Sequence, residues 1–145
     1  MAGAIFFDYN DYRTIYGDKG VGVLKQRVHG VVDVYGGRKP SFEVLRRECS
    51  PVENLQITSQ GGALSATVRS RRQLPMYPLD GYTLRWIVYG FDDLPMEKYE
   101  APLPRLDPRQ TTTVRLSYRE KKPTRVQVDV LRPTGFSAVT VWWKP

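Results

Sequence analysis

Two patterns of hydrophobic and polar positions divide the chain near residue 50. Before that point, a short apolar run at residues 4–7 changes abruptly to polar and aromatic residues at 8–13, and a glycine-containing loop follows. From residue 52 onward, apolar and polar side chains alternate in short segments. Alternation with a period of two is typical of half-buried β-strands. The pattern therefore predicts two domains, residues 1–50 and 51–145.

The second domain is predicted to be a β-sandwich, which makes the chain mainly β. Six or seven short strands separated by turn signals are typical of an immunoglobulin-like or fibronectin-like two-sheet sandwich. The alternating segments lie at residues 55–58, 64–68, 82–89, 112–116, 125–130 and 137–143, and the proline-containing stretch 91–108 has room for one short edge strand. We expect the core to contain Leu84, Trp86, Val126, Val128 and Val130.

The first domain has the order strand, long loop, short helix. Residues 5–7 would form a buried strand, with polar residues at its carboxyl end. Pro40 suits the first turn of a helix, where its missing N–H costs nothing, and Ser50-Pro51 ends that helix. This order is that of one β/α unit of a (β/α)8 barrel, whose functional residues follow the strand ends. Because a parallel strand needs neighbours on both sides, we expect a remnant of a larger barrel.

Composition narrows the range of functions. The chain carries 22 Lys and Arg against 15 Asp and Glu, but its basic residues run no longer than pairs such as Arg46-Arg47. Nucleic-acid-binding proteins more often concentrate positive charge in one stripe, so we predict no nucleic-acid partner. Cys49 and His29 are the only Cys and His, which argues against thiolate and histidine-rich metal sites. We expect no metal, no cofactor and no membrane span.

Candidate chemistry is sparse. Asp8 and Asp11 are the only clustered carboxylates at a predicted strand end, and paired acids can hydrolyse glycosides. On an extended strand, residues three apart point to opposite faces. This favours the alternative that each carboxylate binds a neighbouring Arg or a loop N–H group. The glycine-rich segment 17–22 lacks the spacing of a phosphate-binding loop. Trp142-Trp143 offers aromatic surface for a sugar, although one of two successive strand residues points into the core.

The segment IFFDYNDYRT is followed by GVGVLKQRVHGVVDVYGGRKPSFEVLRRE and then by the alternating β domain. Residues 4–50 thereby resemble the end of glycoside hydrolase family 2, the family of β-galactosidases and β-glucuronidases. The family phrase is matched at Gly30-Val31-Val32-Asp33, Arg38-Lys39-Pro40 and Leu45-Arg46. The resemblance implies that the chain is a C-terminal fragment of a retaining glycosidase acting on oligosaccharides, and that the parent is periplasmic or secreted. The two catalytic Glu of such an enzyme lie on earlier barrel strands.

The resemblance also implies roles for individual residues. No Glu in the chain matches either catalytic motif, so we expect no catalytic residue and no hydrolysis by this chain alone. Phe7 stands where the family usually places a Trp beneath the sugar ring. Asp18 stands where glucuronidases carry an Asn, which points to a neutral sugar such as galactose. The rim of the parent's substrate pocket would be lined or braced by Asp8, Asn10, Asp11 and Arg13.

The alternative is a self-sufficient fibronectin-like module for carbohydrate binding or adhesion, with residues 1–50 as an appendage. The family phrase favours the fragment, because such a module has no reason to carry it. For the fragment, the main expected partner is the remainder of the parent glycosidase. An unpaired strand edge at residues 4–13 tends to pair with another chain. We therefore expect either self-association there or docking of residues 1–13 onto the sandwich.

Overall fold

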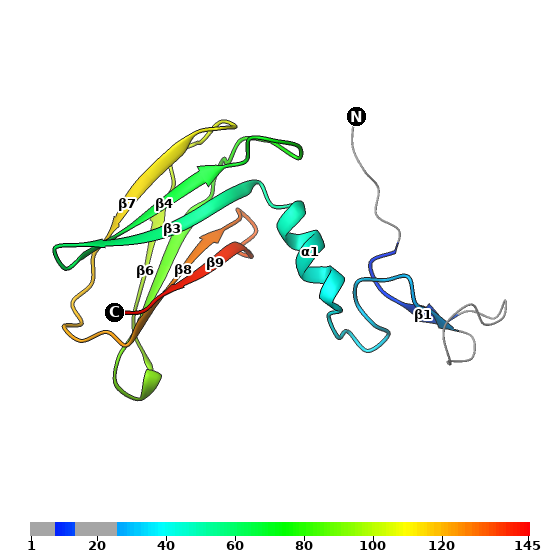
Figure 1. Cartoon of the computed structure of the whole chain (residues 1–145), viewed down its shortest axis with the longest axis horizontal. Helices are drawn as coiled ribbons and strands as arrows, with labels where there is room; N and C mark the ends of the chain where they lie inside the picture. Colours follow the sequence, from blue (N-terminus) through cyan, green and yellow to red (C-terminus); the bar gives the residue numbers. More distant parts are fainter. Residues whose placement is uncertain (1–7, 14–25) are drawn as a thin grey trace. The chain divides into compact units, whose positions relative to one another are not determined.

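The structure is a computed structural model that describes residues 8–13 and 26–145 (Figure 1). The chain forms two compact units, Met1–Cys49 and Ser50–Pro145. The predicted strand at residues 5–7, Phe7 within it and the glycine-rich segment 17–22 lie outside the described residues. Most of the proposed self-association segment, residues 4–13, lies outside them too.

The second unit consists of two antiparallel sheets that enclose one core (Figure 1). One sheet has the order β3-β4-β7 and the other the order β6-β5-β8-β9. The first sheet contains β3 (Val52–Gln60), β4 (Ala63–Ser70) and β7 (Thr111–Leu116); the second contains β5 (Thr83–Tyr89), β6 (Pro95–Pro102), β8 (Arg125–Leu131) and β9 (Ser137–Trp143). A short 3-10 helix, η1 (Phe91–Asp93), joins β5 to β6. The mainly β, two-sheet architecture predicted from the alternation is confirmed.

The core of this unit follows from the alternation of its strands. Every second residue of β5 and β8 points between the sheets, facing the buried side chains of β4. The five residues that we expected in the core are all buried: Leu84, Trp86, Val126, Val128 and Val130. Burying a large apolar side chain contributes about 1.5–3 kcal/mol, so these residues account for much of the driving force for folding.

Strand β6 is longer than the short edge strand expected in the proline-containing stretch. It spans eight residues and pairs with β5 along its length. Pro95 and Pro102 stand at its two ends, where a missing N–H does not interrupt the hydrogen-bond ladder, and β6 is an edge strand. The prolines therefore mark the ends of this strand and not an irregular loop.

A polar cluster lies on the outer face of the four-stranded sheet. The Asp129 carboxylate is fully buried there although it points away from the core. The Arg85 guanidinium donates to its Oδ2 from Nε at 2.9 Å and from Nη2 at 2.8 Å. The Thr140 hydroxyl donates to Oδ1 at 2.6 Å, and the Gln127 amide donates to both oxygens. These donors compensate for the lost hydration of the carboxylate.

The first unit has little regular structure within its described residues. Strands β1 (Tyr12–Arg13) and β2 (Gln26–Arg27) form a two-residue antiparallel ladder, and the helix α1 spans Pro40–Glu48. Pro40 lies in the first turn of α1, as predicted. Phe42 is half-buried, with its ring edge-to-face against Tyr9 and the Arg38 guanidinium above it. This aromatic contact connects the helix to the segment that precedes β1.

Candidate functional site

The Asp11 carboxylate is the centre of the first unit. Its side chain is only 3% exposed, and its Oδ1 accepts a hydrogen bond from Lys39 Nζ at 2.6 Å and one from the Gly30 N–H at 2.9 Å. The hydrogen bond from Lys39, helped by that from Gly30, lowers the pKa of Asp11 below 3.8 against the opposing effect of burial. Asp11 is therefore ionised at neutral pH, and its charge is neutralised by Lys39.

Gly30 is required by the close approach of two backbone segments. A Cβ atom at this position would lie 2.3 Å from the Asn10 carbonyl carbon and 2.4 Å from the Asp11 nitrogen, which is too short for any side chain. Backbone bridges hold the same segments together, parallel between Asn10 and Val32 and antiparallel between Val32 and Arg38. Residues that are distant in the sequence thus meet at one buried ion pair.

The other described residues of the predicted pocket rim have different surroundings. Asp8 is half-buried, and its Oδ2 is buried without a hydrogen-bond partner. Asn10 is exposed and donates from Nδ2 to the Asp11 carbonyl at 3.0 Å. Arg13 is exposed on β1. Asp11 has the contacts expected of a structural carboxylate. One donor is a loop N–H group, as predicted, and the other is a lysine, where an arginine was expected. Its Oδ1 is engaged by these two protein donors.

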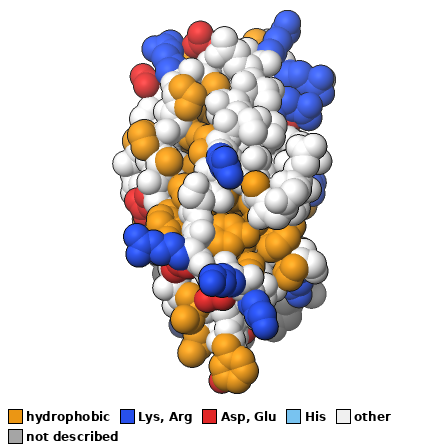
Figure 2. Space-filling model, turned by 90° about the vertical axis from the view of Figure 1, so that its left-hand side faces the viewer, with side chains coloured by type: hydrophobic (Ala, Val, Ile, Leu, Met, Phe, Trp, Pro, Cys, Tyr) orange, Lys and Arg blue, Asp and Glu red, His pale blue; other side chains and the backbone are white. Residues whose placement is uncertain are grey.

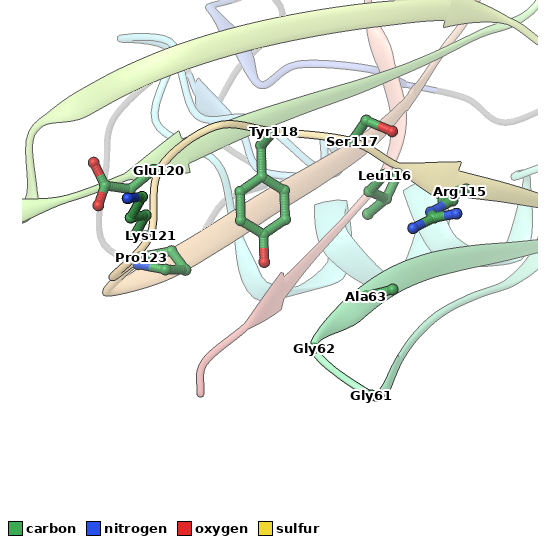
Figure 3. A pocket seen from close by; sticks show the side chains of 10 residues that line it. All are labelled: Gly61, Gly62, Ala63, Arg115, Leu116, Ser117, Tyr118, Glu120, Lys121 and Pro123. Atoms are coloured by element: carbon green, nitrogen blue, oxygen red, sulfur yellow. The ribbon is translucent and has the colours of Figure 1, made fainter.

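A pocket of about 470 Å³ lies in the second unit, at one end of the three-stranded sheet. One wall of the pocket is the turn between β3 and β4 (Figure 3). The other wall is the end of β7 and the segment that follows it. Its lining consists of Gly61, Gly62, Ala63, Arg115, Leu116, Ser117, Tyr118, Glu120, Lys121 and Pro123. Sequence reasoning missed this pocket. Gly61-Gly62 is a turn signal between the alternating segments 55–58 and 64–68, but nothing local indicates that residues 115–123 come to lie opposite it.

The segment after β7 is anchored to the four-stranded sheet at several points. The Trp86 indole donates from Nε1 to the Ser117 carbonyl at 3.0 Å. The Glu97 carboxylate on β6 accepts the N–H groups of Arg119 and Glu120, and it also accepts the Tyr99 hydroxyl. The hydrogen bond from Tyr99 is the largest cause that lowers the pKa of Glu97, and the same bond raises the pKa of Tyr99. The anchored segment forms a fixed wall of the pocket.

One arginine and two aromatic side chains contact one another near one end of the four-stranded sheet. They lie on the neighbouring strands β5, β8 and β9. The Arg125 guanidinium carbon is 4.4 Å from the ring centres of both Tyr89 and Trp142, and Arg125 forms an ion pair with Asp93. Trp142 is 46% exposed, whereas Trp143 packs against the core. On the face shown in Figure 2, the Lys and Arg side chains lie in several separate places among hydrophobic and uncharged ones.

Two further kinds of site were sought in the described part of the chain. Residues 8–13 and 26–145 contain no group of three or more His, Cys, Asp or Glu side chains placed to hold a metal ion. None of the helices within these ranges is long and apolar enough to span a membrane. Within the second unit, the pocket and the exposed Trp142 are candidates for ligand binding.

Comparisons with known proteins do not assign the chain. No model of a known protein family matches it, and no curated protein matches it. Among solved structures it is similar to the crystal structure of an endonuclease/exonuclease/phosphatase from Beutenbergia cavernae, at 15% identity and a TM-score of 0.32. That match covers 63% of this chain and 23% of the other. A similarity of this size carries no argument about function.

Proposed function

We propose that the chain is the C-terminal part of a retaining family 2 glycosidase of the β-galactosidase type. In this proposal, residues 1–50 are the last strand, loop and helix of the catalytic barrel, and residues 51–145 are an accessory domain. The observation that carries the proposal is the contact of Asp11 with Gly30 and Lys39. It joins the segment after the predicted strand to both halves of the family phrase, GVVD and RKP.

This contact gives the family phrase a physical role. In this chain, the segments that match the phrase supply a glycine where two backbones meet, Gly30, and a lysine that neutralises a buried carboxylate, Lys39. Removing one partner of a buried ion pair is strongly destabilising. The Asp11–Lys39 pair would thus hold the loop that follows the last barrel strand. Loops at this end of a barrel carry the substrate pocket, so Asp11 is a positioning residue in this proposal and not a catalytic one.

The strand order of the second unit supports a fibronectin-like accessory domain. The strands β3, β4 and β7 are the first, second and fifth strands of the sandwich, and they form one sheet. The other sheet has the order β6-β5-β8-β9, which are the fourth, third, sixth and seventh strands. With a single cysteine in the chain, no disulfide joins the sheets. The core around Trp86 takes that role, as in fibronectin-type relatives of antibody domains.

The second candidate is a carbohydrate-binding or adhesion module, and the exposed Trp142 is the observation that favours it. An indole on a sheet surface can stack on the apolar face of a sugar ring, and Arg125 and Tyr89 hold this one in place. A module of this kind would bind sugar through Trp142 without any contribution from residues 1–49.

Two measurements test the proposal, and the second also distinguishes the two candidates. The first is an assay of the purified chain on nitrophenyl β-galactoside and nitrophenyl β-glucuronide. The proposal expects no turnover, because retention needs two carboxyl groups about 5–5.5 Å apart and Asp11 is engaged by Lys39. Turnover that is abolished by Asp8→Asn or Asp11→Asn would overturn it.

The second measurement is the coding sequence upstream of the Met1 codon. The proposal expects barrel strands in the same reading frame, with two catalytic Glu residues. An in-frame stop codon, or an unrelated domain, would refute the fragment and favour the module. In that case, loss of sugar binding in Trp142→Ala would identify the module's site.

A further inference from the structure

We propose that the pocket at the end of the three-stranded sheet binds an acidic sugar unit, a hydroxylated ring that carries a carboxylate or sulfate group. The pocket lies entirely within the second unit and is lined by residues 61–63 and 115–123. The inference is independent of the proposed glycosidase parent, and it concerns a different surface from that of Trp142.

The pocket is formed before any ligand arrives. One wall is held by hydrogen bonds from buried Trp86 to the Ser117 carbonyl and from the Arg119 and Glu120 N–H groups to Glu97. The other wall is the two-residue turn Gly61–Gly62, with φ of 56° and 79°. No atom lies within 4 Å of where a Cβ would stand at either glycine. This edge is therefore bare and leaves the entrance open. Binding at such a site requires little reordering of the protein.

The charges at the pocket favour an anion. Arg115 extends from β7 and Lys121 from the following segment, and both side chains are exposed (Figure 3). Neither forms an ion pair with any residue that the structure describes. The remaining cations of that segment, Arg119 and Lys122, add to the positive potential without lining the pocket. An arginine fork and a lysine ammonium are the usual partners of carboxylate and sulfate oxygens.

The remaining lining favours a hydroxylated ring over a simple inorganic anion. Glu120 lines the pocket, and its Oε1 accepts the Lys122 N–H at 2.8 Å. A carboxylate repels a bare anion but accepts hydrogen bonds from sugar hydroxyls. The Ser117 and Tyr118 hydroxyls can both donate and accept.

The shape of the pocket fits the same ligand. The Tyr118 side chain is half-buried and extends into the space between Pro123 and the Gly61–Gly62 turn (Figure 3). There its ring can lie against the apolar face of a sugar. A volume of about 470 Å³ is within the range of about 300–1,000 Å³ that is usual for small-molecule sites.

The test is calorimetric titration of the full chain with four probes in about 0.15 M salt, where the Debye length is about 8 Å. Digalacturonic acid and N-acetylglucosamine 6-sulfate supply the carboxylate and the sulfate. N-acetylglucosamine is the neutral counterpart, and sodium sulfate is the bare anion. We expect at least one acidic sugar to bind about tenfold or more tightly than the neutral sugar and the inorganic salt, a ratio equivalent to about 1.4 kcal/mol. Failure of both acidic sugars to bind, or equal binding of sulfate and sulfated sugar, would overturn the inference.

Matched variants localise the binding. Arg115→Gln and Lys121→Gln should each weaken the acidic sugar about tenfold or more, because each removes a charge-assisted hydrogen bond. Lys122→Gln is the control, since it removes the same charge one residue away from the pocket lining and should change the affinity about twofold at most. All three positions are exposed, so the melting temperatures should match that of the wild type. Equal weakening by Lys121→Gln and Lys122→Gln would mean nonspecific attraction and no site.

Discussion

At the scale of single residues, two side chains on the four-stranded sheet show what alternation can and cannot reveal. Trp86 lies on the inward phase of β5 and is buried, as its position predicts. Asp129 lies on the outward phase of β8, yet it is also fully buried. The difference arises because three side chains cover Asp129 with hydrogen-bond donors. They are Arg85 on β5, Thr140 on β9 and Gln127, two residues earlier on β8. Alternation predicts the face of a residue, but the neighbouring side chains on that face, from its own strand and from adjacent ones, determine its solvent access.

Trp86→Ala should lower the free energy of unfolding by about 3–5 kcal/mol, the usual cost of deleting a large buried aromatic side chain. The loss includes the stacking of Trp86 on Tyr99 and its hydrogen bond to the Ser117 carbonyl. Urea denaturation followed by circular dichroism measures it. Phe91→Ala is the control, because Phe91 follows the same strand but is 82% exposed, and its loss should cost no more than about 0.5 kcal/mol. A Trp86→Ala chain as stable as the control would show that the register of β5 is wrong.

At the scale of elements, the strands were predictable and their contacts were not. Alternation placed the strands of the sandwich because it is a local signal. Two strands are clearly longer than expected: β6, bounded by Pro95 and Pro102, and β3, which spans Val52–Gln60 where residues 55–58 were expected. The candidate sites depend on contacts between distant residues. Asp11 meets partners 19 and 28 residues away, and Glu97 meets amides 22 and 23 residues away. No sequence spacing encodes such meetings, so the pocket could not be predicted.

The Glu97 contact predicts an acid-dependent loosening of the segment after β7. Because the Tyr99 hydroxyl and two N–H groups stabilise the carboxylate, the pKa of Glu97 in the folded state lies below its ordinary value of 4.5. The folded state therefore binds fewer protons than the unfolded state in this range. The stabilisation is complete above pH 4.5 and is lost as the pH falls through the lowered pKa. The protection of the Arg119 and Glu120 amides, their hydrogen exchange relative to an unstructured peptide at the same pH, should fall over that window.

Glu97→Gln should lower the protection of these two amides at every acidic pH, measured against an unstructured peptide at the same pH, and it should flatten the acid limb of the stability curve. Glu100→Gln is the control, since Glu100 lies on the same strand but is exposed, next to Lys98. Tyr99→Phe tests the partner, because it removes the largest cause of the lowered pKa. If the two amides are protected equally in wild type and Glu97→Gln, Glu97 does not anchor the segment.

At the scale of the whole molecule, the chain consists of a self-contained sandwich and a unit whose described residues include few buried side chains. The sandwich encloses one continuous cluster of buried side chains from both sheets. By contrast, the buried residues described in the first unit centre on Val31, Val32 and Asp11. A domain of about a hundred residues with one core can fold alone. In the proposed fragment, the first unit is a single β/α unit, which lacks the neighbours that a parallel strand requires. The two units should therefore differ in their ability to stand alone.

We expect residues 50–145 to fold without the first unit. The fragment should begin at Ser50, because its buried hydroxyl accepts the Val52 N–H and its carbonyl accepts Arg71 Nη1. All three Trp lie in this fragment, so tryptophan fluorescence follows the unfolding of the same unit in both chains. The thermal midpoint of the 50–145 fragment should match that of the full chain. A fragment of residues 53–145 should be less stable by about 1.5–3 kcal/mol from the loss of buried Val52 alone.

The mass in solution provides a second comparison of the full chain with the 50–145 fragment. If residues 4–13 mediate self-association, the full chain should associate and the 50–145 fragment should be monomeric. A 50–145 fragment that fails to fold would show that the first unit is part of the sandwich's own stability.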